Sequence, residues 1–203
     1  MISSIENLDN STIHQEYGQI IGRLEAARQA SGRGRVMAIS GCTGGNGATF
    51  VLRELARGLA KGSRRGVLEA TCADLSLVSR LKAGDLLAQC FFAREAGLWQ
   101  ISTPSKTALD FPGEADLLAT VSVLSARFDF VVLDSGPVNL GGQIWQVGPV
   151  VDDVFLVVAA GETRLDQIAY AQRIINQSGA HLSGCILNKR TYPLPSFLHR
   201  ILN

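Results

Sequence analysis

The sequence predicts an α/β domain with a mostly parallel sheet that is covered by helices on both faces. Short apolar runs alternate along the 203-residue chain with stretches in which apolar residues recur every three or four positions. Strands that are apolar on both faces are typical of a parallel sheet buried between helices. A glycine-rich segment follows the first such strand, and an aspartate ends a later one, at the sheet edge where α/β proteins bind their ligands.

Two regions of different character are expected. Residues 1–33 should form a polar leader and one helix, because apolar side chains recur there at helical spacing. Residues 34–203 should form the domain itself. Its expected strands, in chain order, are Val36–Ser40, Val67–Leu75, Leu98–Ile101, Phe128–Leu133, Val154–Ala159 and Cys185–Leu187. Its expected helices are Ala48–Lys61, Asp116–Ala126 and Arg164–Ser178.

The composition is that of an ordinary globular protein, with 46% hydrophobic and 18% charged residues. The 19 basic and 18 acidic side chains nearly cancel, so the total charge gives no electrostatic reason to expect nucleic acid or an anionic membrane as the main partner. The four cysteines are scattered without metal-ligand spacing. The longest apolar runs have strand length, far below the roughly 20 residues of a membrane-spanning helix. We therefore expect a cytoplasmic protein without direct membrane insertion.

The segment GCTGGNGATF (41–50) joins the first predicted strand to the helix that follows it. Its glycines allow the backbone to turn N–H groups inward around an anion, and the helix adds the positive end of its dipole. A phosphate-binding P-loop also needs a lysine and then a serine or threonine after the last glycine. Thr49 stands at the hydroxyl position, where it would hold magnesium, whereas Ala48 stands at the lysine position.

The run FDFVVLDSGP (128–137) predicts a buried strand that ends at an acidic residue, Asp134. A carboxylate at the end of a buried strand is typical of a Walker B motif, which lies beside the P-loop at the carboxyl edge of the sheet. The sequence therefore predicts that Asp134 lies close to Thr49.

On these motifs the chain resembles the cytoplasmic ATPase domain of bacterial tyrosine kinases (BY-kinases) and polysaccharide co-polymerases, within the MinD/ParA-like group of P-loop proteins. GGNGAT (44–49) is similar to that family's PGEGKS, and FDFVVLDSGPV (128–138) is similar to its YDxVIIDTPPV. VDDVFLVVAAGETR (151–164) and GCILNKRTYPLPSFLHRIL (184–202) are similar to the family's later strand and closing tail. The resemblance implies a single-domain P-loop NTPase-like fold.

The resemblance also implies a site for ATP or ADP with magnesium. Thr49 and Asp134 would hold the metal, and Asn188 matches the asparagine that contacts the adenine base in that group. The loop residues around the phosphates would be Gly44, Gly45, Asn46, Gly47, Ala48, Thr49 and Phe50.

The chain differs from the family's pattern at the positions that the family uses for its chemistry and its assembly. Ala48 replaces the lysine. The aspartates that end a second strand in the family align with TCAD (71–74), which puts Cys72 in place of the first carboxylate and leaves Asp74 as the match for the second. In the family's oligomerisation motif, Gln19 and Gly22 replace two arginines, so we expect no ring through this helix, while other oligomers stay open.

We therefore expect a kinase-like regulatory protein of exopolysaccharide or capsular polysaccharide biosynthesis or export, with weak or lost ATP binding and phosphoryl transfer. Its expected partner is a membrane co-polymerase or activator protein that recruits it to the inner face of the plasma membrane; nucleic acid is not expected. Three alternatives stay open. The chain could be an active ATPase or tyrosine kinase in which Arg53 substitutes for the lysine, a MinD/ParA-like positioning protein with Thr43 in the region of the signature lysine, or a scaffold that binds no nucleotide.

Overall fold

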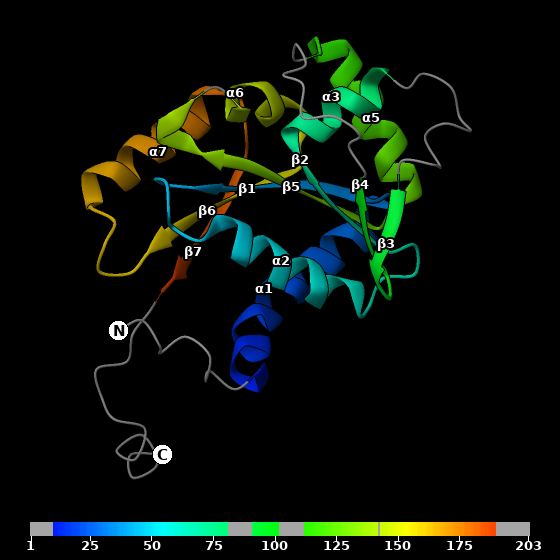
Figure 1. Cartoon of the computed structure of the whole chain (residues 1–203), viewed down its shortest axis with the longest axis horizontal. Coiled ribbons are helices and arrows are strands. Elements are labelled where there is room, and N and C mark those ends of the chain that lie inside the picture. The colour runs from blue at the N-terminus through cyan, green and yellow to red at the C-terminus, as the bar shows by residue number, and fades with distance from the viewer. Residues whose placement is uncertain (1–9, 81–90, 102–111, 142, 190–203) are drawn as a thin grey trace.

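A computed structural model describes residues 10–80, 91–101, 112–141 and 143–189; residues 1–9 of the predicted leader and most of the predicted tail lie outside these ranges. The strands are β1 (Arg35–Gly41), β2 (Val67–Thr71), β3 (Phe91–Glu95), β4 (Leu98–Ile101), β5 (Phe130–Pro137), β6 (Asp153–Ala159) and β7 (Leu182–Asn188). They form one sheet in the order β3-β4-β2-β5-β1-β6-β7 (Figure 1). Every pairing is parallel except that of β3 with β4.

Helices cover both faces of the sheet, as the sequence predicts. They are α1 (Asn10–Ser31), α2 (Ala48–Ala60), α3 (Cys72–Arg80), α5 (Glu114–Arg127), α6 (Gln143–Val147) and α7 (Leu165–Gln177), with 3-10 turns η1 (Val138–Leu140) and η2 (Gly148–Val150). Figure 1 shows α1 and α2 below the sheet and the other helices above it. Within the described ranges no helix is long and apolar enough to cross a membrane.

The central strands separate two apolar cores. Met37 and Ile39 of β1 point to the core under α1 and α2, while Val36 and Ala38 point to the core under α3, α5, α6 and α7. Because successive side chains of a strand alternate between faces, both sets must be apolar, which explains the continuous apolar runs of the sequence. Leu24 of α1 is buried in the first core, and Tyr17, Ile20 and Ile21 of the same helix pack against that core.

The predicted strand Val67–Leu75 is wrong in its second half, because β2 ends at Thr71 and α3 begins at Cys72. The Asp74 carboxylate accepts hydrogen bonds from the Thr71 N–H (2.7 Å) and hydroxyl (2.8 Å), and the Asp74 N–H donates to the Thr71 hydroxyl. This reciprocal pair is a capping box that starts a helix. Leu75 and Val78, which follow it, face the core from a helix instead of from a strand. Strand β3 was not predicted.

The carboxyl ends of the parallel strands meet at one edge, where the glycine-rich segment connects β1 to α2. Asp134 of β5 lies level with Ile39 of β1 on one side and with Thr71 of β2 on the other. At the left-hand end of the sheet in Figure 1, α2 begins at this edge and runs back across the sheet. The fold therefore brings the two predicted motifs to the same place.

At the opposite edge, the buried carboxylate of Asp129 joins three segments. It accepts hydrogen bonds from the backbone N–H groups of Arg64 (2.7 Å) and Arg65 (2.9 Å), and it pairs with the guanidinium groups of Arg65 (3.0 Å) and Arg28 (3.4 Å). Burial alone would raise the pKa of Asp129, but the hydrogen bonds from Arg65 and Arg64 and the charge of Arg28 outweigh it and hold the pKa below its ordinary value. This carboxylate ties α1 and the α2–β2 loop to the start of β5.

We expect Asp129→Asn to lower the free energy of unfolding at pH 7 by about 1.5–3 kcal/mol, because it removes charge-assisted hydrogen bonds from a buried position. Urea denaturation followed by circular dichroism measures the change. Asp166→Asn is the matched control: its carboxylate is exposed, so the change should stay within about 0.5 kcal/mol.

The same carboxylate sets a pH dependence. Because its pKa is lower in the folded than in the unfolded state, its stabilisation is complete above the unfolded-state pKa of about 3.9 and is lost as the pH falls through the folded-state value. The stability gap between wild type and Asp129→Asn should therefore shrink below about pH 4. A gap that is constant from pH 7 to pH 3 would contradict this role.

Candidate functional site

The loop between β1 and α2 has the backbone of an anion cradle. Gly45 and Gly47 have φ angles of 80° and 81°, in the left-handed region that glycine adopts without strain. Among the described residues, the N–H groups of Gly44, Gly45 and Gly47 donate no hydrogen bond to the protein. The first N–H groups of α2 follow directly and lack intrahelical partners. Unpaired N–H groups at a helix N-terminus are suited to bind phosphate oxygens.

The side chain of Asn46 braces this loop from inside. It is 3% exposed, although the two residues before it, Gly44 and Gly45, are exposed. Its Oδ1 accepts hydrogen bonds from the Thr43 N–H (2.5 Å) and the Thr43 hydroxyl (3.1 Å), and its Nδ2 donates to the Thr163 hydroxyl (3.1 Å). The Thr163 hydroxyl also accepts from the Ala159 N–H at the end of β6 (3.0 Å). The loop is thus joined to the β6–α7 turn by a polar network centred on buried Asn46.

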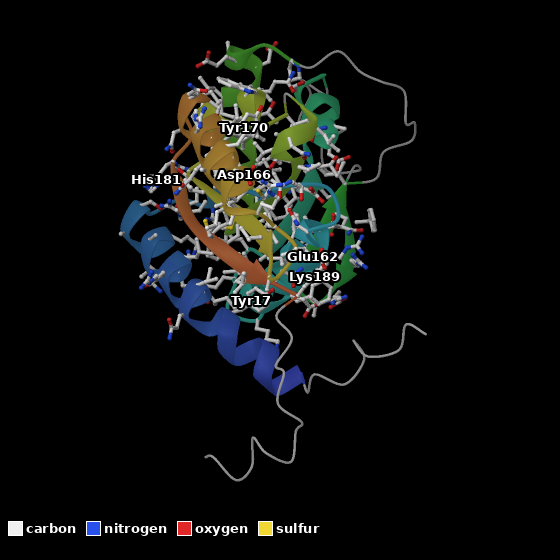
Figure 2. All side chains as sticks on the ribbon, turned by 90° about the vertical axis from the view of Figure 1, so that its left-hand side faces the viewer. Tyr17, Glu162, Asp166, Tyr170, His181 and Lys189 are labelled. Atoms are coloured by element: carbon white, nitrogen blue, oxygen red, sulfur yellow. The ribbon has the colours of Figure 1, made fainter. Side chains whose placement is uncertain are left out.

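Asn188 completes the network from the end of β7. Its Nδ2 donates to the Asn46 carbonyl oxygen (2.9 Å), and its side-chain amide lies where a Cβ atom on Gly47 would be. Its backbone carbonyl accepts from the Ala160 N–H (2.8 Å), which fixes its position next to β6. Figure 2 shows the neighbouring ion pair of Glu162 and Lys189, whose atoms approach to 2.9 Å. Asn188 therefore adjoins the predicted phosphate loop, where it holds the loop backbone.

Thr49 and Asp134 are in direct contact, as the two sequence motifs predict. The Thr49 hydroxyl donates to Asp134 Oδ2 at 2.6 Å, and Oδ1 of the same carboxylate accepts from the Gly136 N–H at 2.9 Å. A hydroxyl and a carboxylate are the oxygen ligands that Mg²⁺ accepts beside substrate phosphates. Within the described residues no group of three or more His, Cys, Asp or Glu side chains could hold a metal ion. A magnesium ion here would therefore need phosphate oxygens and water.

No cation in the described part of the chain occupies the position of the P-loop lysine. The Ala48 methyl group is partly buried and packs against the core under α2. Arg53, one turn further along α2, points away: its Nε lies 3.4 Å from Oε1 of buried Glu69, in the middle of β2. Arg94 approaches the other oxygen of Glu69 at 3.5 Å. Phe50 follows Thr49 in the first turn of α2 and is half exposed.

The end of β2 lacks a carboxylate directed at Asp134. Thr71 occupies the strand-end position beside Asp134, and Cys72 is the first residue of α3 with a buried thiol. Burial, together with the nearby charges of Asp134 and Asp74, raises the pKa of Cys72 to about 12, so this thiol stays neutral. Asp74 is buried and engaged in its own capping box with Thr71. The segment TCAD (71–74) thus provides a strand end without a free acid.

A cavity of about 390 Å³ lies between the outer side of the loop and α7. Figure 2 shows two of its lining residues, Asp166 and Tyr170, on α7. Cys42 is also among its lining residues; burial and, secondarily, Cys185 raise the pKa of the Cys42 thiol, so a reactive thiolate is disfavoured there. The complete lining is Cys42, Thr43, Asn139, Asp166, Gln167, Tyr170 and Arg173.

The structure brings together the loop residues, Thr49, Asp134 and Asn188, and it directs the Asp74 carboxylate to a structural contact. Sequence reasoning missed Thr163, which is essential to the network around Asn46. The signal that could have found it is topological: Thr163 follows a predicted strand whose carboxyl end must lie at the same edge as the loop.

Comparison with protein-family models and with curated proteins finds no match. Solved structures do match. The kinase domain of Escherichia coli tyrosine kinase ETK has 22% identity and a TM-score of 0.60, over 80% of this chain and 71% of that chain. The VpsO kinase domain has 22% identity and a TM-score of 0.72, over 92% of this chain and 98% of that chain.

A third match is the septum site-determining protein MinD complexed with Mg-ADP from Pyrococcus horikoshii OT3, with 16% identity and a TM-score of 0.56 over 83% of this chain and 76% of that chain. These likenesses confirm that the chain has the P-loop fold shared by bacterial tyrosine kinase domains and MinD/ParA ATPases.

Two glycines of the loop allow a matched test of its packing. Gly45→Ala should cost about 1–2 kcal/mol, because an alanine is strained at this φ but its Cβ meets nothing within 4 Å. Gly47→Ala should cost about 1–3 kcal/mol more, because its Cβ would also collide with the Asn188 amide. Urea denaturation of both variants measures the difference in the free energy of unfolding.

The double variant Gly47→Ala/Asn188→Ala identifies the collision. It should be less destabilised than the sum of its single variants, because removing the amide relieves the clash. Equal costs for Gly45→Ala and Gly47→Ala, or strict additivity in the double variant, would show that Asn188 does not pack against the loop.

Proposed function

We propose that this protein is a kinase-like regulatory component of exopolysaccharide or capsular polysaccharide biosynthesis or export, and that its ATP binding and phosphoryl transfer are weak or lost. The observation that carries the proposal is a contrast within one loop. The backbone cradle and the Thr49–Asp134 pair are assembled, whereas Ala48 presents only a methyl group. The site keeps the parts that hold phosphate by geometry and lacks the part that neutralises its charge.

The free-energy cost of losing the lysine explains why nucleotide binding and phosphoryl transfer should be weakened to different degrees. A charged hydrogen bond to phosphate contributes about 1.5–3 kcal/mol, so a cradle without it retains weak affinity. Transfer of a phosphoryl group depends more strongly on preorganised charge, and loss of one such donor typically costs on the order of 10²–10³ in rate. The absence of a free carboxylate at Thr71 adds to that cost. Weak binding with little turnover is the expected combination.

The structure also argues against internal replacement of the lysine. Arg53 would have to leave Glu69, and this would leave a buried carboxylate with poorer compensation. Thr43 lies in the region of the MinD/ParA signature lysine, but its hydroxyl donates to Asn46 and its side chain carries no charge. These contacts favour the regulatory function over an active kinase and over a MinD/ParA-like positioning protein.

If a nucleotide binds, this chain would contribute contacts from three places. The N–H groups of Gly44, Gly45 and Gly47 would face the phosphates, and Thr49 and Asp134 would hold the magnesium ion, which supplies neutralisation of phosphate charge when bound. Asn188 would have to divide its amide between the Asn46 carbonyl and an adenine base. Recognition of the base should therefore be weak as well.

We propose a membrane co-polymerase or activator protein as the partner, which would recruit this chain to the inner face of the plasma membrane. The resemblance to the family of BY-kinases and co-polymerases supports this assignment, and the likeness in fold to the ETK and VpsO kinase domains is consistent with it. Co-purification of the tagged chain with candidate co-polymerases tests it directly, and no association with any of them in the native host would refute it.

Replacing Ala48 with lysine tests the nucleotide part of the proposal. The substitution should raise the affinity for ATP with magnesium about 10–100-fold, because it restores one charged hydrogen bond to phosphate. Hydrolysis should recover only in part, since the end of β2 still lacks a free carboxylate. Isothermal titration calorimetry and a phosphate-release assay measure the two effects.

Ala48→Met is the control, because methionine has nearly the length of lysine without its charge; it should leave the affinity unchanged. Robust hydrolysis by the wild-type chain that Asp134→Ala abolishes would show an active enzyme and overturn the proposal. Absence of binding even in Ala48→Lys would show a loop closed to phosphate and favour a nucleotide-free scaffold.

A further inference from the structure

The amino ends of β1, β2 and β5 lie at the edge of the sheet opposite the P-loop, where three segments distant in sequence are joined. The Gly34 N–H donates to the Ser125 carbonyl, the Arg35 N–H to the Asp129 carbonyl, and the Asp129 N–H to the Gly66 carbonyl, each at 3.0 Å. The segments 31–35, 61–66 and 125–129 therefore form one continuous surface.

Arginines are concentrated on this surface, which we call the cationic edge. Its members are Arg28, Arg33, Arg35, Arg64, Arg65 and Arg127. Three carboxylates face them, those of Asp129, Asp152 and Asp153. Lys61 and Glu25 both adjoin Gly62, and their charges cancel. The cationic edge thus carries three more positive than negative charges, although the whole chain carries only +1.

The exposure of these charged side chains, more than their number, determines which charge faces the solvent. The Arg33 side chain is 51% exposed and its partner Asp152 only 15%, and Arg65 is 39% exposed while Asp129 is 2%. The carboxylates therefore lie beneath the guanidinium groups. The Arg64 side chain is exposed and has no partner among the described residues. A molecule or surface that approaches the cationic edge from solvent therefore meets positive charge first.

The negative C-terminal ends of the nearby helices offset only part of this positive charge. The C-termini of α1, α2 and α5 point to this edge, and each carries about half a negative charge. Three such ends offset about half of the excess of three positive charges, and basic residues in the last turns of helices commonly serve that purpose. Exposed Glu95, which ends β3 beside this edge, is itself paired with Arg57. The remaining positive charge is available to a partner.

We infer that the cationic edge binds the anionic headgroups of a membrane surface. Arginine forks pair with lipid phosphate through two hydrogen bonds, and clustered basic residues near a bilayer bind anionic lipids additively. Nucleic acid fits less well. The rings under Arg28 and Arg127, those of Phe130 and Phe91, are buried and offer no stacking platform for bases. The helices at this edge end there, so none presents its N-terminus to a DNA groove.

Such binding would orient the molecule. The P-loop, the cavity beside α7 and the ends of β6 and β7 lie at the opposite edge and would face away from the bilayer. The inference does not depend on nucleotide binding, nor on the identity of a protein partner. A peripheral electrostatic contact of this kind also needs no inserted segment.

Sedimentation with lipid vesicles tests the inference on the full chain. It should co-sediment with vesicles of 30% phosphatidylglycerol in phosphatidylcholine at 50 mM NaCl, and not with pure phosphatidylcholine. Arg64→Gln/Arg127→Gln should lower the partition coefficient about 25-fold, since each basic residue near the surface contributes about fivefold. The wild-type partition should also fall steeply as the salt concentration rises.

Arg164→Gln/Arg173→Gln is the matched control, because it removes the same charge from the start and middle of α7; it should retain nearly all of the binding. Circular dichroism confirms that both variants are folded. Equal losses in the two double variants, or no binding of the wild type to anionic vesicles, would overturn the inference. Binding of a fluorescent double-stranded DNA that depends on Arg64 and Arg127, without vesicle binding, would assign the edge to nucleic acid and also overturn it.

Discussion

The candidate site depends on one buried side chain, the amide of Asn46. A loop with three glycines in four positions has many conformations open to it, and each ordered residue costs backbone entropy. Asn46 fixes the loop by accepting from the Thr43 N–H and donating to Thr163, while Asn188 holds its carbonyl oxygen. Asn46 is buried and its partners are half-buried, and both its side-chain oxygen and its side-chain nitrogen are satisfied, so the network restricts the loop to one conformation. In this chain the shape of the phosphate loop is held by neutral protein groups.

This arrangement explains how a P-loop can persist without its lysine. The cradle needs neither a cation nor a bound phosphate to keep its form, and the contact of Thr49 with Asp134 keeps the metal-binding oxygens in place. What the chain lacks is charge, because Ala48 is apolar and Arg53 is directed to Glu69. A shaped but uncharged site is suited to a regulatory protein, in which a structured loop can serve as a contact surface without turnover.

The sequence was sufficient for the elements that local pattern determines. Apolar runs predicted the central strands, and the two motifs predicted the contact of Thr49 with Asp134, because parallel strands must bring their carboxyl ends to one edge. Contacts between distant segments could not be predicted. The capping box of Thr71 and Asp74 turned an expected strand into α3, and Thr163 and Asp129 gain their roles only from the partners that folding brings to them. Total charge was equally uninformative, because it hid the separation of arginines and carboxylates by depth at the cationic edge.

Amide hydrogen exchange, measured residue by residue by NMR on the nucleotide-free protein, tests the central claim most directly. If Asn46 holds the loop, the Thr43 N–H should be protected by its bond to Asn46 Oδ1, while the N–H groups of Gly44, Gly45 and Gly47 exchange rapidly. The protection of Thr43 should disappear in Asn46→Ala. Rapid exchange of Thr43 at the same rate as the neighbouring glycines, with protection appearing only after ATP and magnesium are added, would contradict the account.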